Sequence, residues 1–162
     1  MKQKSNKGFT LLEVLIAVLV LSIGLLGLAG LQLTGLRNNH SANLRGQATQ
    51  FAYDMVDQVR ANPVGLAAAS YNSPTSASTA TCLTTEGCTP AQLAQHNMFE
   101  WLADITNALP DGDAIICLDE SPEDGTSAAK ACSGGGTIYA VKVWWTDDRS
   151  GTEKLFVTTV AF

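Results

Sequence analysis

The chain has 162 residues, of which 46% are hydrophobic and 15% are charged, and its formal net charge is −5. This length fits one modest domain together with an anchoring segment. An acidic chain is not typical of proteins that bind nucleic acid through phosphate contacts, because its net charge repels the phosphate backbone. The composition therefore predicts no nucleic-acid partner.

The first eight residues, MKQKSNKG, contain three lysines and no acid. An apolar run from Phe9 to Leu31 follows, and its polar side chains are those of Thr10, Glu13 and Ser22. As a helix, this run would be about 35 Å long, enough to cross a hydrocarbon core of about 30 Å. The positive-inside rule places the lysines in the cytoplasm and the rest of the chain across the inner membrane. We therefore expect a single-pass inner-membrane protein with a periplasmic C-terminal part.

Glu13 is unusual for a membrane anchor. A carboxylate in an apolar run costs about 2.5–3.5 kcal/mol at mid-membrane and less near the interface. A simple signal anchor does not require this acid, and neither does a secretory signal peptide cut near Gly27-Leu28-Ala29. Both interpretations stay open as alternatives, but the position of Glu13 indicates a function of its own.

The segment Gly8-Phe9-Thr10-Leu11-Leu12-Glu13 resembles the class III signal of type IV prepilins and type II secretion pseudopilins. Like that signal, it follows a short basic leader and opens an apolar helix. The resemblance implies that prepilin peptidase cleaves after Gly8 and methylates the new N-terminus, Phe9. It also implies that Glu13 neutralises the amine of Phe9 on a neighbouring subunit, because an unpaired carboxylate destabilises an apolar helix bundle.

Four later segments are similar to the minor pilin family PilV, the type IV pilus modification proteins. They are residues 18–32, Arg60-Ala61-Asn62-Pro63, residues 88–94 followed by Glu100-Trp101, and residues 141–145. This narrower resemblance implies a minor pilin that helps to initiate type IV pilus assembly and contributes to twitching motility and adhesion. Its implied partners are other minor pilins, the major pilin, prepilin peptidase and the inner-membrane assembly platform.

The helix that starts at Phe9 is expected to continue beyond the membrane to Ala61. Apolar residues recur with helical spacing in its outer half, at Ala48, Phe51, Ala52, Met55, Val56 and Val59. Asn62-Pro63 ends the helix, because a residue before proline disfavours the helical conformation. Gly24, Gly27, Gly30 and Gly35 each weaken the helix by about 1 kcal/mol relative to alanine. They predict either close packing against other helices or a stretch that bends.

We therefore divide the chain into four parts. Residues 1–8 form a leader peptide, and residues 9–31 form the transmembrane and polymerisation half of the N-terminal helix. Residues 32–62 form its amphipathic half. Residues 63–162 form a periplasmic globular pilin domain.

A second helix is predicted from Pro90 to Ala108. Thr89 is a good N-cap, Pro90 suits the first helical position, and Gln92 completes a capping box. The apolar face of this helix is expected to consist of Met98, Leu102, Ile105 and Leu109. Pro110 ends the helix.

Three strands are predicted after the second helix, at Ala114–Leu118, Thr137–Thr146 and Lys154–Phe162, with a hairpin loop over residues 147–153. Strand alternation places Tyr139, Val141, Val143 and Trp145 on one face, and Lys142 and Trp144 on the other. The predicted fold is α+β and type IV pilin-like: a long N-terminal helix packed on an antiparallel sheet, with an additional helix before the sheet.

The four cysteines lie in the part of the chain that we expect in the oxidising periplasm, so they predict disulfides. Four cysteines allow three pairings, and sequence order favours Cys82 with Cys88 and Cys117 with Cys132. A zinc site is the alternative interpretation, but the spacings do not match paired C-x-x-C ligands.

Residues 119–125 form an acidic segment with four carboxylates before a glycine. Calcium binding is the alternative to a solvated loop, but the spacing does not follow the EF-hand pattern, so a solvated loop is preferred. The two histidines, His40 and His96, have no serine or cysteine motif beside them. The sequence therefore predicts a protein that is not an enzyme and has no cofactor and no metal.

Three functions are compatible with these patterns. The first is a minor pilin in the inner membrane that later becomes part of the pilus, at its tip or along its shaft. The second is a minor pseudopilin of a type II secretion system. The third, from a different class, is an uncleaved, membrane-anchored periplasmic binding module.

Overall fold

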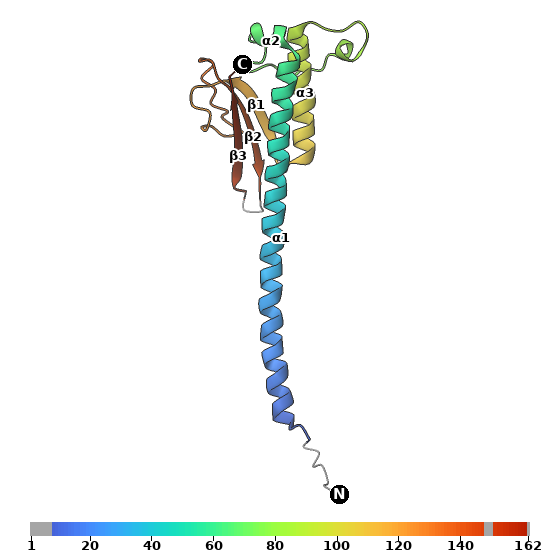
Figure 1. Cartoon of the computed structure of the whole chain (residues 1–162), viewed down its shortest axis with the longest axis vertical. Coiled ribbons are helices and arrows are strands. Elements are labelled where there is room, and N and C mark those ends of the chain that lie inside the picture. The colour runs from blue at the N-terminus through green and yellow to red at the C-terminus, as the bar shows by residue number, and fades with distance from the viewer. Residues whose placement is uncertain (1–7, 148–150, 162) are drawn as a thin grey trace. The chain divides into compact units, whose positions relative to one another are not determined.

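The computed structural model describes residues 8–147 and 151–161, and it falls into two compact units divided between His40 and Ser41 (Figure 1). The boundary lies within the long helix α1 (Leu11–Ala61). The elements that follow are α2 (Pro63–Ala67), the short 3-10 helix η1 (Ala80–Leu83), α3 (Pro90–Ala108), β1 (Asp113–Leu118), β2 (Tyr139–Thr146) and β3 (Glu153–Val160). This order confirms the predicted α+β fold.

Helix α1 begins two residues later than the predicted start at Phe9. The backbone N–H of Glu13 donates to the hydroxyl of Thr10 at 3.3 Å and to its carbonyl oxygen at 3.1 Å. A threonine that accepts from the third residue after it acts as a helix N-cap. Gly8 and Phe9 therefore precede the helix. The predicted end at Ala61 is confirmed.

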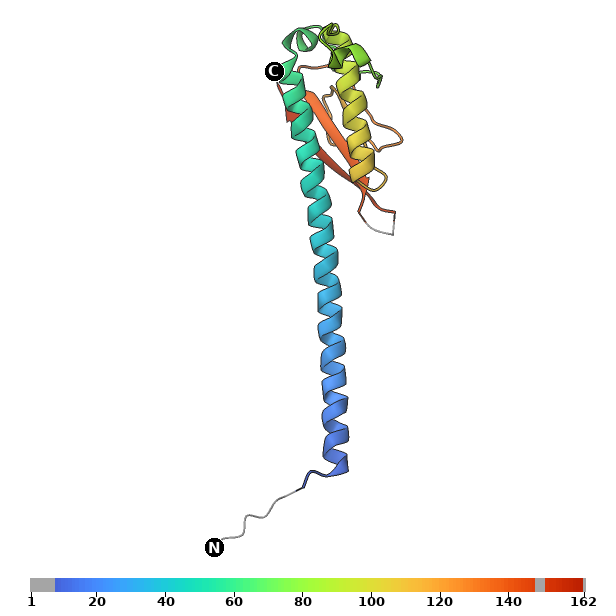
Figure 2. The same ribbon diagram turned by 90° about the vertical axis from the view of Figure 1, so that its right-hand side faces the viewer.

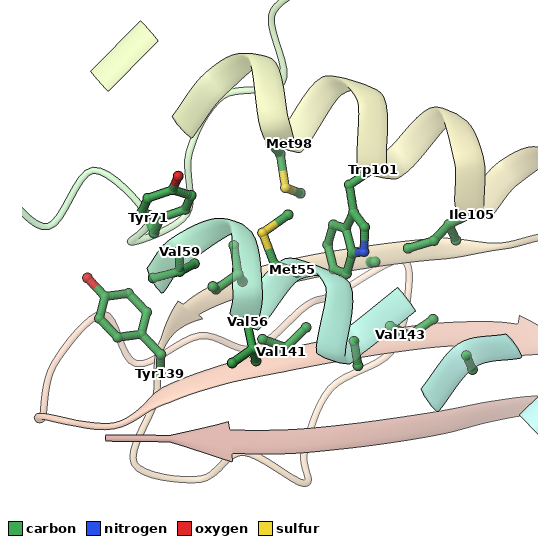
Figure 3. Packing of buried hydrophobic residues seen from close by; sticks show 14 of the residues in the cluster. Met55, Val56, Val59, Tyr71, Met98, Trp101, Ile105, Tyr139, Val141 and Val143 are labelled. Carbon is green, nitrogen blue, oxygen red and sulfur yellow. The ribbon is translucent and has the colours of Figure 1, made fainter. Parts of the chain in front are cut away.

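In the second unit, α1 contributes one buried face to the core. Its buried residues are Leu44, Ala48, Ala52, Met55, Val56 and Val59. Helix α3 lies beside it on the same side of the sheet, as Figures 1 and 2 show. Figure 3 shows the side chains of Met55 and Met98 pointing toward one another between the two helices. The indole of Trp101 donates to the carbonyl oxygen of Phe51 at 2.8 Å and joins the helices by a partly buried hydrogen bond.

The buried face of α3 differs in part from the prediction, because it also includes Ala94 and His96. Met98, Ile105 and Leu109 are buried as expected, but Leu102 is only half-buried, and Trp101 takes the central place. The helical spacing allows either residue on this face. Trp101 occupies the buried position because its indole N–H can donate to a carbonyl oxygen of α1.

The three strands form one antiparallel sheet, as predicted, and their order, which the sequence did not predict, is β1-β2-β3. In the register, Val141 of β2 lies between Ile116 and Thr158. Strand β2 begins at Tyr139 rather than Thr137, and the predicted end of the last strand, Phe162, lies outside the described residues, as do residues 148–150 of the hairpin loop. All residues of β2 except Thr146 are buried.

A central strand is buried on both faces only when each face is covered. Val141 and Val143 face the helices and belong to the core cluster. Lys142 and Trp144 lie on the opposite face, as the alternation predicts, and they are 0% and 1% exposed. In Figure 1 the long segment between β1 and β2 lies against this side of the sheet. The sheet is therefore covered by helices on one face and by this segment on the other.

The side chain of Asn62 joins the ends of three helices. Its carbonyl oxygen accepts from the backbone N–H of Gly65 at 3.0 Å and so caps α2. Its amide nitrogen donates to the carbonyl oxygen of Pro90 at 2.8 Å and to the hydroxyl of Tyr71 at 3.3 Å. A Cβ atom at position 65 would collide with the Asn62 amide, so this position requires glycine. Asn62 therefore fixes how α1, α2 and α3 meet.

Replacing Asn62 by alanine should lower the free energy of unfolding by about 1–3 kcal/mol, because it removes the amide hydrogen bonds to Pro90 and Tyr71 and leaves the N-terminus of α2 without its cap. Urea denaturation of the full chain in detergent, followed by tryptophan fluorescence of the second unit's core, measures the change. Asn107→Ala is the matched control, since Asn107 is exposed on α3, and it should change stability by less than about 0.5 kcal/mol. Equal effects of the two variants would contradict this role.

Candidate functional site

The N-terminal segment that carries the predicted processing site is fully exposed. The side chain of Phe9 is 82% exposed, and a Cβ atom built at Gly8 would meet nothing within 4 Å. Glu13 is exposed on the first turn of α1, and its carboxylate has no partner among the residues that the structure describes. The structure thus brings Gly8, Phe9 and Glu13 close together at the start of α1 and leaves them accessible. The lysines of the predicted leader lie outside the described residues.

Large apolar side chains cover this part of α1 and remain exposed. Leu11, Leu26 and Leu31 are each more than two thirds exposed, and every other large apolar side chain from Phe9 to Leu36 is more than half exposed. Helix α1 is the one helix in the described part of the chain that is long and apolar enough to cross a membrane, by length and composition. Monomeric soluble proteins rarely expose an apolar surface of this extent, so this surface is a contact surface for lipid or for protein.

The structure joins Cys82 to Cys88 and Cys117 to Cys132. This is the pairing that sequence order favours. The first disulfide closes a small loop around η1, just before α3. The second joins β1 to the segment that covers the outer face of the sheet.

The acidic segment 119–125 is not simply a solvated loop, which corrects the prediction for Asp119 and Asp124. The ammonium of Lys142 lies 2.6 Å from Asp119 Oδ2 and 2.9 Å from Asp124 Oδ1. It also donates to the carbonyl oxygens of Asp124 at 3.1 Å and Ala131 at 3.0 Å. The side chains of Lys142 and Asp119 are 0% exposed. We call this arrangement of Lys142, Asp119, Asp124 and Ala131 the lysine cage.

Asp119 is held on its other side by backbone donors. Its Oδ1 atom accepts from the N–H groups of Ser121 at 3.1 Å and Ser133 at 3.3 Å. Gly125, with φ of +87°, makes the turn that lets Asp124 and Ala131 approach the same cation, and a Cβ atom there would lie 2.9 Å from the Ala129 carbonyl oxygen. The left-handed conformation and the close approach both favour glycine.

Burial and pairing act in opposite directions on the pKa values of the cage. Burial raises the pKa of Asp119, but hydrogen bonds from Lys142, Ser121 and Ser133 outweigh it and leave the pKa below its ordinary value. The hydrogen bond from Lys142 lowers the pKa of Asp124. Burial lowers the pKa of Lys142, but its bonds to Asp119 and Asp124 outweigh that effect and leave the pKa above its ordinary value. These directions favour the charged forms of all three side chains.

One group of possible metal ligands occurs in the described residues, at Cys117, Asp119 and Cys132, whose ligand atoms lie within 4.8 Å of one another. Both cysteine sulfurs are used in the disulfide. Asp119 directs one oxygen at Lys142, a cation already in place. These donors do not form a metal site, because a metal needs free thiolate or carboxylate ligands.

The two histidines lie in different environments. His40 is exposed on α1, as expected. His96 is buried on α3, where its Nδ1 atom accepts from the backbone N–H of Thr79 at 3.3 Å. Neither histidine has a serine or cysteine nucleophile among its hydrogen-bond partners in the described residues, so no nucleophile and base are assembled at either position.

Comparison with protein families accounts for the N-terminal part of this geometry. Residues 3–29 match the prokaryotic N-terminal methylation motif, and residues 30–99 match the family described as type IV pilin Tt1218. The first match contains Gly8, Phe9 and Glu13, and the second runs from the exposed helix through Asn62 to the first half of α3. Residues 30–99 thus correspond to a type IV pilin domain. The searches for similar curated proteins and for similar solved structures found no significant match.

The type IV pilin domain fits the rest of the structure. A long N-terminal helix on an antiparallel sheet is the arrangement of a type IV pilin, a structural rather than an enzymatic family. The exposed apolar half of α1 fits a membrane-anchored pilin, and the pilin family implies association with pilus components and processing by prepilin peptidase. The sheet and the lysine cage lie beyond the matched residues.

Sequence reasoning missed the lysine cage, although a signal for it was present. Lys142 lies in the strand sequence Val-Lys-Val-Trp-Trp, where a charge among large apolar residues requires a partner if the strand is buried on both faces. The acid-rich segment after β1 supplied candidates for that partner.

Replacing Lys142 by methionine should destabilise the protein by about 3–5 kcal/mol, because it leaves the Asp119 carboxylate buried without its partner. The double variant Lys142→Met with Asp119→Asn should recover much of this loss, since the amide oxygen introduced at position 119 can still accept from Ser121 and Ser133. Lys130→Met is the control: its pair with Asp113 is about one third exposed and should contribute less than about 1 kcal/mol. Urea midpoints of the variants measure these differences, and a double variant no more stable than Lys142→Met would contradict the cage.

The lowered pKa of Asp119 predicts that the protein loses stability in acid. A carboxyl group with a depressed pKa in the folded state stabilises the fold above its unfolded pKa of about 3.9, and this contribution disappears as the pH falls through the folded pKa. Urea midpoints should therefore fall more steeply below about pH 4 in the wild type than in the Lys142→Met, Asp119→Asn double variant. Parallel acid profiles would show that Asp119 is not the group responsible.

Proposed function

We propose that this chain is a minor pilin of the PilV kind, which helps to initiate type IV pilus assembly and thereby supports twitching motility and adhesion. The observation that carries the proposal is the exposed Glu13, without a partner among the described residues, on an apolar helix directly behind Gly8-Phe9. A carboxylate in apolar surroundings needs a cationic partner. When that partner is not in the same chain, it comes from another one.

Processing at Gly8 would supply that partner. Cleavage after Gly8 by prepilin peptidase makes Phe9 the N-terminal residue and gives it an amine, which the same enzyme methylates. The exposure of Gly8 and Phe9 supports access by the peptidase. The cationic amine of Phe9 in one subunit can then neutralise Glu13 in the next, which fixes the axial position of neighbouring subunits.

The surface of α1 around Glu13 is suited to close helix packing. Glu13, Ala17, Gly24 and Gly27 lie on one stripe of the helix, because spacings of three and four residues repeat on one face. A Cβ atom at Gly24 or Gly27 would meet nothing within 4 Å, so contacts inside the chain do not require these glycines. Small residues let neighbouring helices approach closely. The stripe supports contact with other pilins along the same face that carries Glu13.

The proposed location follows from processing and from the helix. The N-terminus lies in the cytoplasm, residues 9–31 cross the inner membrane, and the domain from residue 63 onward lies in the periplasm, where Cys82–Cys88 and Cys117–Cys132 form. After assembly the subunit lies in the pilus, at the tip or along the shaft. Its proposed partners are other minor pilins, the major pilin, prepilin peptidase and the inner-membrane assembly platform.

The second candidate is a minor pseudopilin of a type II secretion system, because the Gly8-Phe9 and Glu13 pattern resembles that of pseudopilins too. Deleting the gene and counting surface pili, together with a secretion assay, distinguishes the two functions. Loss of pili with normal secretion is the expected result. Loss of secretion with normal pili would support the pseudopilin function instead.

Mass spectrometry of the membrane-extracted protein tests the processing step. The wild type should lack residues 1–8 and carry one added methyl group on Phe9, and Gly8→Val should keep its leader, since a branched side chain blocks the close approach that glycine allows. Gly24→Val, at another exposed glycine of α1, should still be cleaved. A wild-type protein that retains Met1 would exclude the prepilin interpretation and favour an anchored binding module.

Replacing Glu13 by alanine should leave cleavage and membrane insertion intact but reduce the amount of this subunit in sheared pili about tenfold or more, because breaking a buried charge pair costs about 3–5 kcal/mol. Ser22→Ala is the matched control, since the Ser22 hydroxyl is already satisfied by the carbonyl oxygen of Val18 at 2.7 Å within the same helix. Immunoblots of the pilus and membrane fractions measure the distribution. Normal incorporation of Glu13→Ala would overturn the docking role.

A further inference from the structure

The loop between α2 and α3 is joined to α3 by few hydrogen bonds. In the described part of the chain, two backbone donors of residues 74–87 reach α3: the N–H of Ala77 donates to the carbonyl oxygen of Gln95 at 3.2 Å, and the N–H of Thr79 donates to Nδ1 of His96 at 3.3 Å. The loop also contains η1 and the Cys82–Cys88 disulfide. Loss of either hydrogen bond therefore removes one of the two backbone hydrogen bonds from this loop to α3 in the described residues.

The bond to Thr79 requires one tautomer of His96. An Nδ1 atom that accepts a hydrogen bond carries no proton, so this geometry places the ring proton on Nε2. Nε2 is buried, lies 3.4 Å from Glu100 Oε1 and makes no well-aligned hydrogen bond among the described residues. The ring is 3% exposed, whereas the Glu100 side chain is 53% exposed. His96 thus lies between a backbone donor and a carboxylate at the protein surface.

Charged groups from the neighbouring elements do not pair with His96 in the described residues. Helix α2 and η1, which pack against α3, contain no charged side chain. Asp57 of α1 pairs with Arg60, Asp113 of β1 pairs with Lys130, and Glu86 of the loop is exposed. The carboxylate that responds to a charge on His96 is therefore Glu100 of its own helix.

We propose that His96 is an acid-sensitive latch for the loop of residues 74–87. A second proton on the ring occupies Nδ1 and turns this atom from an acceptor into a donor that faces another donor, the N–H of Thr79. The resulting imidazolium is attracted to Glu100 and loses its bond to the loop. The bond between Ala77 and Gln95 does not involve a titrating group, so acid loosens η1 and the disulfide loop without opening the core.

Amide hydrogen exchange of the full chain in detergent tests this proposal. Protection factors should be compared at about pH 8 and about pH 5, the limits between which histidine commonly changes charge. We expect the protection of Thr79 to fall about fivefold or more in acid, as for loss of one hydrogen bond, while the core amides of β2 keep their protection. Unchanged protection of Thr79 would overturn the latch, and so would an equal loss in β2, which indicates general unfolding.

Variants identify the group that titrates. His96→Asn places a non-titrating acceptor near the position of Nδ1, so Thr79 should stay protected at both pH values. His40→Asn changes the second histidine, which is exposed on α1, and should keep the wild-type response. A wild-type response in His96→Asn would overturn the proposal. The ¹⁵N chemical shifts of His96 in the wild type provide a test that needs no variant: a ring that keeps an unprotonated Nδ1 throughout the loss of Thr79 protection would also overturn it.

Discussion

The buried ammonium of Lys142 is the constraint on which the second unit depends. Strand β2 lies at the centre of a three-stranded sheet and is buried on both faces. A lysine in such a strand is tolerated only when acids accompany it into the interior. Asp119 and Asp124 meet this requirement, and in doing so they draw the segment after β1 across the outer face of the sheet. The same fold of the segment places Cys132 beside Cys117.

A charge in apolar surroundings needs a partner of opposite charge, and the two units differ in where that partner is found. In the second unit the acid and its cation are both in the chain, and the pair is closed to solvent. In the first unit Glu13 lies on an exposed apolar helix and has no partner among the described residues. The internal ion pair lets the domain fold without a partner molecule, whereas the unpaired carboxylate of the helix requires a cation from outside the described residues. This contrast is what we expect of a subunit whose folded domain is complete before assembly and whose helix is completed by assembly.

Single polar side chains also connect the segments around the core. Asn62 joins the ends of α1, α2 and α3 through an amide, which does not titrate, so this junction is insensitive to pH. His96 joins the following loop to α3 through an imidazole, whose hydrogen-bonding pattern changes with its charge. The chemistry of the connecting side chain thus decides which junction is permanent and which one responds to acid.

The sequence by itself determined the elements and the N-terminal site. Period-2 alternation marked β2, proline and threonine marked α3, and the local motif Gly8 to Glu13 defined the proposed processing segment, because each of these signals is contained in a few neighbouring residues. The tertiary structure decided what depends on segments far apart in the chain. The sequence does not show that Lys142 is buried against Asp119 and Asp124. It also does not show that His96 accepts a hydrogen bond from Thr79. Such contacts follow from the path of the chain in space, which local sequence patterns do not encode.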